Sequence, residues 1–232
     1  MELDNLDAAD QAFLKGCLIG DGWLGLQRRQ YVHLRIGHCE AQLPWLQWKA
    51  ERLNRILRRD RRILGPYVQG DGSSSGKKHI SYLYSVDDHQ LFKPWYDRWY
   101  EHDGRRSRKK IDKAYLNGLD MQALAILWCD DGSIYSSNRV KKHRCKDGSI
   151  HEYPYVEARG TIALCSFTDH ENQLIADWIY SLTGVRFSHY SSKGYPLLGI
   201  GKQALKEFIP QVDPYIPDCM KRKADLSHCR VR

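Results

Sequence analysis

The sequence lacks any long apolar segment: no run approaches the roughly 18 residues that a membrane-spanning helix needs. It also lacks the features of a signal or transit peptide, because the first ten residues, MELDNLDAAD, are acidic and polar. No CxxC pair occurs, which argues against a zinc ribbon. No RRM, KH or zinc-finger motif is present. These absences disfavour a membrane protein and the common RNA-binding modules.

Cysteine is present but unevenly placed. The seven cysteines are scattered along the chain, and three of them, Cys17, Cys129 and Cys165, have apolar neighbours, as buried thiols commonly do. The spacing of His143, Cys145 and His151 leaves a metal site as an alternative there. An odd number of scattered cysteines favours an intracellular, reducing compartment.

The charge balance is strongly basic. The 232 residues include 36 Lys and Arg against 28 Asp and Glu, a formal net charge of +8. The hydrophobic share of 42% allows a substantial core. A basic domain of this size usually binds a polyanion, and nucleic acid is the leading partner because no membrane feature is present.

A repeated pattern divides the chain into halves. An apolar segment precedes Asp-Gly twice, in LKGCLIGDG (14–22) and LAILWCDDG (124–132), and Asp21 and Asp131 are 110 residues apart. After each motif come a strand-like run, an amphipathic helix, an alternating strand and another helix. The pattern predicts residues 1–104 as one half, 105–117 as a polar, basic, exposed linker and 118–232 as the other half.

Each half is predicted to form two hairpins. In the first half the hairpins cover residues 23–37 and 64–86, and in the second half the first hairpin carries a long insertion, SSNRVKKHRCKDGSIHEYP. Tryptophans at 45, 48, 95, 99 and 178 recur beside apolar residues on predicted helices, which favours core packing over base stacking. The predicted class is α+β, with two antiparallel sheets and helices on one face.

The carboxylate in each motif is at an unfavourable place for a helix. Asp21 is predicted in the last turn, where the helix dipole is negative and the final carbonyls lack internal partners. A lone Asp-Gly is commonly just a turn, but two copies at a half-chain interval favour a functional role. Carboxylates with free carbonyls suit a hard cation such as Mg²⁺, and a hydrolytic site for phosphodiesters would use such ions.

These motifs resemble those of LAGLIDADG homing endonucleases of the single-chain, two-motif, intron-encoded type. The first motif departs from the family pattern at Lys15, Cys17 and Gly20 but keeps the acidic eighth position at Asp21. The second resembles the LAxWxxDDG form, with Asp131 in that position. YIPDCMKRK (215–223) is similar to the family's P-x-C-M-x-Y-K segment, and RKKID (108–112) to its K-K-x-x-P segment.

The resemblance implies two pseudo-symmetric αββαββα halves with saddle-shaped sheets, and motif helices packed at the central interface. It implies that Asp21 and Asp131 bind divalent ions, Mg²⁺ with Mn²⁺ as a substitute, helped by the carbonyls of Gly20 and Asp130. Lys109 and Lys223 would be the catalytic lysines; Lys110 is the alternative to Lys109.

The sheets would bind double-stranded DNA in the major groove. The residues predicted to contact DNA are Arg28, Arg29, His33, Arg35, Lys78, Tyr82, Tyr84, Arg139, Lys141, Lys142, His143, Arg159, His189 and Lys193. In YVHLRIG, period-two spacing places His33 and Arg35 on one face and Val32, Leu34 and Ile36 on the other.

The implied activity is that of a monomeric, site-specific endonuclease that hydrolyses both strands of a long asymmetric target and leaves short 3′ overhangs. It would be found in the cytoplasm of a bacterial or phage-infected host, or in an organelle. The alternative is a non-cleaving RNA splicing maturase, which would bind intron RNA, or a DNA-binding regulator on the same scaffold. Retention of both Asp21 and Asp131 favours cleavage.

Overall fold

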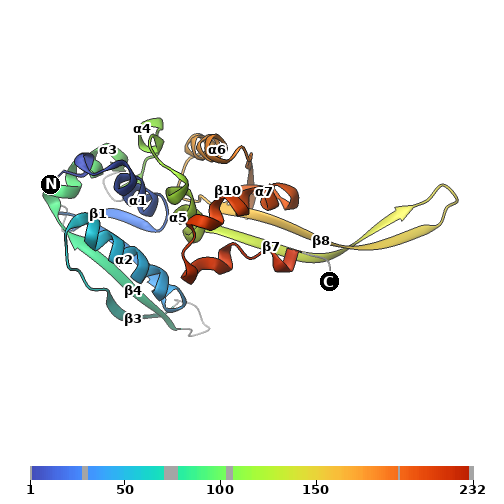
Figure 1. Cartoon of the computed structure of the whole chain (residues 1–232), viewed down its shortest axis with the longest axis horizontal. Helices are drawn as coiled ribbons and strands as arrows, with labels where there is room; N and C mark the ends of the chain where they lie inside the picture. The colour runs from blue at the N-terminus through green and yellow to red at the C-terminus, as the bar shows by residue number, and fades with distance from the viewer. Residues whose placement is uncertain (1, 28–30, 71–77, 103–106, 193, 230–232) are drawn as a thin grey trace. The chain divides into compact units, whose positions relative to one another are not determined.

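The structure, a computed structural model, describes residues 2–27, 31–70, 78–102, 107–192 and 194–229 (Figure 1). The chain forms two compact units, residues 1–130 and 131–232. This division comes after the second motif helix, whereas the sequence places the boundary between halves in residues 105–117. The second motif helix packs against the first one, so spatial proximity groups it with the N-terminal unit. The boundary between the duplicated halves along the chain stays a prediction.

The first unit follows the predicted element order. Its principal elements are α1 (Ala8–Ile19), β1 (Gly22–Gln27), β2 (Tyr31–Cys39), α2 (Leu43–Leu57), β3 (Leu64–Gly70), β4 (Lys78–Asp87) and α3 (His89–Trp99). The strands form one antiparallel sheet in the order β1-β2-β4-β3. Both predicted hairpins of this half are therefore present.

One face of this sheet belongs to the core. Val32, Leu34 and Ile36 of β2 are at most 1% exposed, and Leu34 and Ile36 are opposite Val86 and Tyr84 of β4. Helix α2 packs against β2 and β4, and α3 packs against β2. The period-two prediction for β2 is confirmed on its apolar side.

The two motif helices approach each other closely. The second motif forms α5 (Met121–Asp131), and a Cβ added to Gly16 of α1 would lie 2.8 Å from the Cα of Ala123. Glycine at position 16 therefore allows the two backbones to come together. Lys15 is only 7% exposed, and its ammonium lies 5.0 Å from the ring centroid of Trp99.

The predicted linker is largely structured. After β5 (Tyr100–His102), the chain forms β6 (Ser107–Lys109), paired with β5, and α4 (Lys113–Leu116). Ile111 and Tyr115 are each 3% exposed, and the Tyr115 hydroxyl donates to the Lys15 carbonyl at 2.8 Å. The expectation of an exposed linker is wrong for residues 107–116, because apolar residues interspersed among the charged ones anchor the segment to α1.

The second unit repeats the same order after α5. Its elements are β7 (Gly132–Arg144), β8 (Ile150–Ala163), α6 (Asp169–Thr183), β9 (Ser188–Ser192), β10 (Tyr195–Gly201) and α7 (Lys202–Val212), followed by 3₁₀ turns at Asp213–Tyr215, Asp218–Lys223 and Ser227–Cys229. The sheet order β7-β8-β10-β9 is equivalent to that of the first unit. Counted together with α5, the elements of the second unit repeat the αββαββα order of the first, and the predicted α+β class is confirmed.

The core of the second unit lies between its sheet and its helices. Ile162 and Leu198 are directly opposite each other and fully buried, and α7 packs on β8 and β10. Thr168 begins α6 with a capping box, in which its side chain and that of Glu171 each accept from the other's backbone N–H.

The tryptophans at 45, 95, 99 and 178 are all buried, and Trp48 stacks on Trp45 with centroids 5.0 Å apart.

The insertion in the first hairpin of the second unit is not a loop. It extends β7 and β8 into a two-stranded ribbon, residues 136–144 and 150–158, which pair from Ser136 opposite Ala158 to Arg144 opposite Ile150. Strand β10 pairs with β8 only at residues 159–163. The ribbon therefore continues beyond the four-stranded part of the sheet, as Figure 1 shows.

Candidate active site

The two motifs end differently. Helix α1 ends at Ile19, Gly20 is its C-cap, and Asp21 follows the helix instead of occupying its last turn. Helix α5 continues through Asp130 and Asp131. The Asp21 side chain is 38% exposed, whereas that of Asp130 is completely buried. Asp21 is therefore accessible to solvent, and Asp130 belongs to the interior of the first unit.

Four hydrogen bonds converge on the Asp130 carboxylate. Oδ1 accepts from Lys49 Nζ at 2.6 Å and from Trp45 Nε1 at 2.7 Å. Oδ2 accepts from Lys49 Nζ at 2.7 Å and from the backbone N–H of Asp21 at 3.0 Å. Each oxygen thus has two donors, and this carboxylate is fully satisfied inside the protein.

Lys49 is the cation that makes the Asp130 position tolerable. Burial favours the neutral form of each group, but their mutual attraction outweighs it: the pKa of Lys49 is raised and that of Asp130 is lowered. The sequence predicts that a metal ion balances the negative charge of the carboxylates at the helix ends. For the Asp130 side chain, the Lys49 ammonium from α2 balances this charge instead.

His38 connects this pair to Asp21. Its Nε2 is 3.3 Å from Lys49 Nζ, and its Nδ1 is 3.5 Å from Oδ2 of Asp21. The His38 side chain is 1% exposed. Asp21 is thus contacted on its backbone by Asp130 and on its side chain by His38.

The predicted catalytic lysines lie beside the motif ends of their own units. Lys109 Nζ donates to the Gly20 carbonyl at 2.6 Å, and Lys223 Nζ donates to the Gly132 carbonyl. Lys110 is 3.9 Å from Glu101 at the surface. The geometry therefore favours Lys109 over Lys110 for the first unit.

The arrangement of carboxylate, imidazole and carbonyl groups around Asp21 decides which of them could bind a metal ion. Among the described residues, Asp21, His38 and Asp130 form the group of three whose ligand atoms lie within 4.8 Å of one another. Because four hydrogen bonds, two of them from Lys49, already saturate the Asp130 carboxylate, its side chain does not fit a metal. The accessible Asp21 carboxylate fits a hard divalent cation, and the Gly20 carbonyl, which accepts from Lys109, has a second lone pair for the same ion. Within the part of the chain that the structure describes, His143, Cys145 and His151 do not form such a cluster.

The open face of the first sheet carries part of the predicted DNA-contacting set. Arg35 is half-buried, with its guanidinium 5.7 Å from the Trp23 ring centroid. His33 shares this face but is only 3% exposed, with its ring 5.3 Å from that of Trp23. Neither His33 ring nitrogen has a partner within the described residues, and burial lowers the pKa of His33. Trp23 thus separates His33 from solvent.

Three residues of β4 that are predicted to contact DNA lie on the opposite face of the sheet. Tyr84 is fully buried and its hydroxyl donates to Asn54 Oδ1 at 2.9 Å; its assignment as a DNA contact is corrected to a core residue. Tyr82 and Lys78 are an even number of residues from Tyr84, so they belong to the same helix-side face. The period-two alternation predicted for this strand is present. Because Tyr84 has a polar hydroxyl, however, the sequence does not indicate that its face is the buried one.

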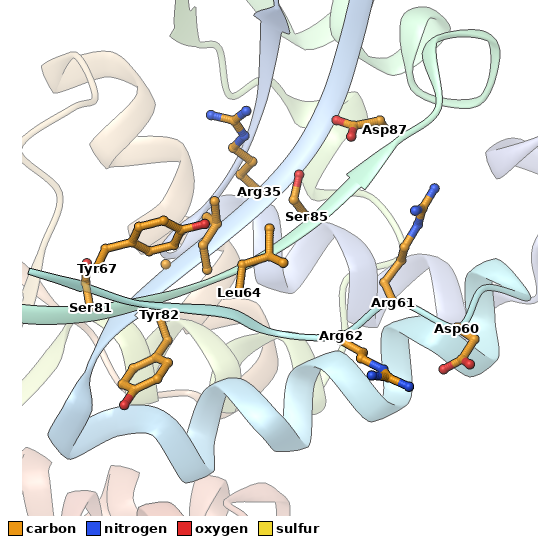
Figure 2. A pocket seen from close by; sticks show the side chains of 12 residues that line it. Arg35, Asp60, Arg61, Arg62, Leu64, Tyr67, Ser81, Tyr82, Ser85 and Asp87 are labelled. Carbon is orange, nitrogen blue, oxygen red and sulfur yellow. The ribbon is translucent and has the colours of Figure 1, made fainter.

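A hollow on the first unit reveals cations that the sequence interpretation omitted. It is lined by Arg35 of β2, Arg61 and Arg62 of the α2–β3 connection, and Tyr67 and Ser85 of the sheet (Figure 2). The signal was available as the run RRDRR at 58–62, which is exceptionally basic for a connection between two elements. Asp60 and Asp87 also line the hollow, so its three arginines leave an excess of positive charge, which suits a polyanion.

The ribbon of the second unit has two chemically distinct faces. Residues directly opposite each other share a face, as do residues two apart in a strand. One face, the basic–aromatic face, includes six exposed residues: Arg139, Lys141, His143, His151, Tyr153 and Tyr155. Glu157 lies on the same face and pairs with Arg139 at 3.1 Å. Lys142 is on the other face, where it pairs with Glu152 at 2.7 Å.

The remaining predicted contacts divide between faces. Arg159 continues the basic–aromatic face into the sheet, with its guanidinium 5.1 Å from the Tyr135 ring centroid. His189 is opposite the buried Leu198 and lines a hollow with α6, so it is on the helix side. Arg28, Arg29 and Lys193 lie outside the described residues.

Comparisons with known proteins agree with this architecture. The homing endonuclease I-WcaI, solved bound to its DNA recognition sequence, is 17% identical with a TM-score of 0.72, covering 95% of this chain and 87% of that one. I-LtrWI, a LAGLIDADG homing endonuclease solved bound to target DNA, is 10% identical with a TM-score of 0.53, covering 90% and 83%. At these identities the likeness concerns the fold.

Curated relatives are similar in sequence. A protein named RecA from Mycobacterium shimoidei is 28% identical over 223 residues, covering 93% of this chain and 46% of that protein. A RecA from Mycobacterium gastri is 26% identical over 215 residues, covering 90% and 45%. The chain thus spans about half the length of these relatives.

No helix within the described ranges is long and apolar enough to cross a membrane. The profile of the LAGLIDADG DNA endonuclease family matches residues 11–208, which include both Asp-Gly motifs, both sheets and Lys109. With the αββαββα order present twice along the chain and closely packed motif helices, the chain belongs to the LAGLIDADG DNA endonuclease family.

Proposed function

We propose that the protein is a monomeric, Mg²⁺-dependent homing endonuclease that cuts both strands of a long asymmetric DNA target, leaving short 3′ overhangs. The observation that carries this proposal is the accessible Asp21 beside the Gly20 carbonyl, next to the contact made by Lys109. A family member that had lost cleavage would have no need to keep this arrangement. Asp131, at the equivalent position in the second motif, supports the same interpretation.

The proposed roles follow from the chemistry of phosphodiester hydrolysis. Asp21 and Asp131 would hold divalent ions, together with the backbone carbonyls of Gly20 and Asp130. The bound ions would supply a hydroxide nucleophile and stabilise the leaving oxygen. Lys109 and Lys223 would orient water or stabilise the charge that develops on the phosphate. Manganese is expected to replace magnesium, since both accept oxygen ligands.

DNA would bind on the open faces of the two sheets. In the first unit, Arg35 and the arginines at 61 and 62 offer phosphate or base contacts around the hollow in Figure 2. In the second unit, the ribbon offers its basic–aromatic face, and a two-stranded ribbon fits the major groove. The two surfaces differ in shape, which suits a target whose two halves differ in length and sequence.

All seven cysteines are free, which is consistent with the proposed reducing intracellular compartment. A host organelle or a bacterial or phage-infected cytoplasm would meet this condition.

Cleavage of the natural insertion site tests the proposal. The protein is incubated with DNA spanning the uninterrupted host locus, with Mg²⁺ or with EDTA. We expect Mg²⁺-dependent cuts in both strands, which disappear in Asp21→Asn and in Asp131→Asn while DNA binding persists. Binding without cleavage in the wild type would instead indicate a DNA-binding regulator. Preferential binding and splicing of the host intron RNA would indicate a maturase.

A further inference from the structure

The proposed chemistry leaves the Asp130–Lys49 pair without a role. Both side chains are completely buried, and removing two charges from water is costly. Apolar residues of similar volume commonly replace buried ion pairs without loss of stability, and often with a gain. Stability alone is therefore a weak reason for this pair.

Besides Trp45, the contacts of the pair lead to Asp21. Asp130 Oδ2 accepts the backbone N–H of Asp21 at 3.0 Å. Lys49 Nζ is 3.3 Å from His38 Nε2, and the other ring nitrogen of His38 is 3.5 Å from the Asp21 carboxylate. The pair thus reaches Asp21 by two routes, one through the backbone and one through the side chain.

We propose that Lys49, Asp130 and His38 are positioning residues that fix the Asp21 carboxylate for its divalent cation. This inference rests on the proposed role of Asp21 as a metal ligand. Asp21 follows the end of α1, and its backbone N–H donates to Asp130 instead of to a helix carbonyl, so the constraint on its position comes from outside the helix. A buried acceptor for its N–H and a buried imidazole beside its carboxylate supply that constraint.

Gly20 is part of the same arrangement. A Cβ at this position would lie 2.2 Å from Asp130 Oδ2, so the seventh residue of the first motif leaves the space that the seventh residue of the second motif fills. The asymmetry between GDG and DDG is then functional: the Asp130 side chain orients, whereas the Asp21 side chain binds. Outer-shell residues of this kind typically change metal affinity or activity about 10–100-fold.

A rival interpretation makes Asp21, His38 and Asp130 the metal ligands themselves. The ammonium of Lys49 argues against it, because Nζ is within 2.7 Å of both Asp130 oxygens and 3.3 Å from His38. A divalent cation held by the same atoms would be repelled by this charge. The two interpretations make opposite predictions for removal of Lys49: positioning is lost, whereas a site blocked by Lys49 would gain affinity.

The test replaces the ion pair by an apolar one. Lys49→Met with Asp130→Leu removes both charges together, so the variant is expected to fold. Mn²⁺ alone is titrated into the full chain and its binding is followed by electron paramagnetic resonance, with Asp21→Asn giving the contribution of Asp21. We expect the Asp21-dependent affinity to fall about 10–100-fold in the double variant. Unchanged affinity would overturn the proposal. Because Asp130→Leu also removes a ligand of the rival site, the rival is tested by Lys49→Met alone: positioning predicts a lower Asp21-dependent affinity, and an increased affinity would favour the rival site.

A second readout does not depend on metal. Hydrogen exchange of the Asp21 amide is expected to be slow in the wild type and faster in the double variant, while amides in the middle of α1 keep their rates. Equal exchange of the Asp21 amide in both proteins would contradict the role of Asp130. For His38, the Gln variant, which keeps polar atoms, should retain more Mn²⁺ affinity than the Leu variant; equal losses would overturn its role.

Lys15 provides a matched control. It is another buried lysine, 7% exposed, but it faces Trp95 and Trp99. Lys15→Met should leave Mn²⁺ affinity unchanged. These measurements separate the two proposals: Asp21-dependent Mn²⁺ binding that weakens in the double variant, without cleavage of any DNA, would sustain positioning and refute the endonuclease.

Discussion

The ends of the two motifs share a pattern but not a structure. Helix α1 stops at Ile19 and leaves Asp21 partly exposed, whereas α5 continues through Asp130 and Asp131. At the seventh motif position one copy has glycine and the other a buried aspartate, and the side chain of the second occupies the space left by the first. Two copies of one motif have thus become complementary, so that neither can be exchanged for the other.

The two sheets show the same divergence at larger scale. Their strand orders are equivalent, but the first hairpin has strands of 6 and 9 residues in the first unit and of 13 and 14 in the second. The first surface is a hollow with arginines, and the second is an extended ribbon with one basic–aromatic face. The two sheets thus share a topology, while the proposed DNA-binding surface of each has its own shape.

We expect the largest effect from a variant that removes only one partner of the Lys49–Asp130 pair. Lys49→Met leaves the Asp130 carboxylate buried without its cation, which should cost about 3–5 kcal/mol of the free energy of unfolding. Urea denaturation followed by fluorescence measures this loss. The double variant with Asp130→Leu should recover most of it. A single variant as stable as the wild type would mean that Asp130 is not buried as described.

Filling the space at Gly20 tests the same interface from the other side. In Gly20→Ala the added methyl would lie 2.2 Å from Asp130 Oδ2, and such overpacking costs about 1–3 kcal/mol. Urea denaturation again provides the measurement. Gly37→Ala is the control, since its methyl would meet its nearest atom at 3.7 Å; it should be neutral or slightly stabilising. Equal stability of the two variants would refute the complementarity.

Neighbouring lysines on opposite ribbon faces test the comparison of surfaces. Lys141 is on the basic–aromatic face opposite Tyr153, whereas Lys142 is paired with Glu152 on the other face. Lys141→Gln should weaken DNA binding and reduce the slope of log affinity against log salt by about 1, the effect of one lost phosphate contact. Lys142→Gln should change the slope little. Fluorescence anisotropy over a salt series distinguishes them, and equal slopes would mean that the two faces do not differ in contact with DNA.

Much of the fold was predictable because its signals are local. The period-two alternation of Val32, Leu34 and Ile36 and the repeated apolar run before each Asp-Gly each specify an element within a few residues. Because these signals occur once in each half of the chain, they also predict the order of the elements in both halves. The length of the ribbon was less accessible, because the insertion resembles a polar loop and its strand character depends on cross-strand pairing.

The candidate site was only partly predictable. Asp21 and Lys109 are recognisable from motif positions, but the contact between Lys49 and Asp130 joins residues 81 apart in the chain. Lys49 did leave one signal, since it interrupts the apolar stripe formed by Trp45, Leu46 and Leu53 on α2. A lysine in such a stripe needs a buried partner, and the sequence alone does not identify which of the 28 acidic residues provides it.

The smallest expected effect concerns the rigidity of the motif helices. Each contains a buried cysteine, Cys17 in α1 and Cys129 in α5, whereas Cys39 is exposed. Burial raises the pKa of Cys17 to about 12, so at pH 8 only about one thiol in ten thousand is ionised and reactive. Iodoacetamide followed by mass spectrometry should label Cys39 promptly and leave Cys17 and Cys129 unmodified in the folded protein.

Lys49→Met should accelerate labelling of Cys17, because loss of the cation destabilises the packing around α1. Labelling of Cys17 as fast as Cys39 in the wild type would show that α1 opens readily, and that Asp21 lacks the rigid support assigned to it.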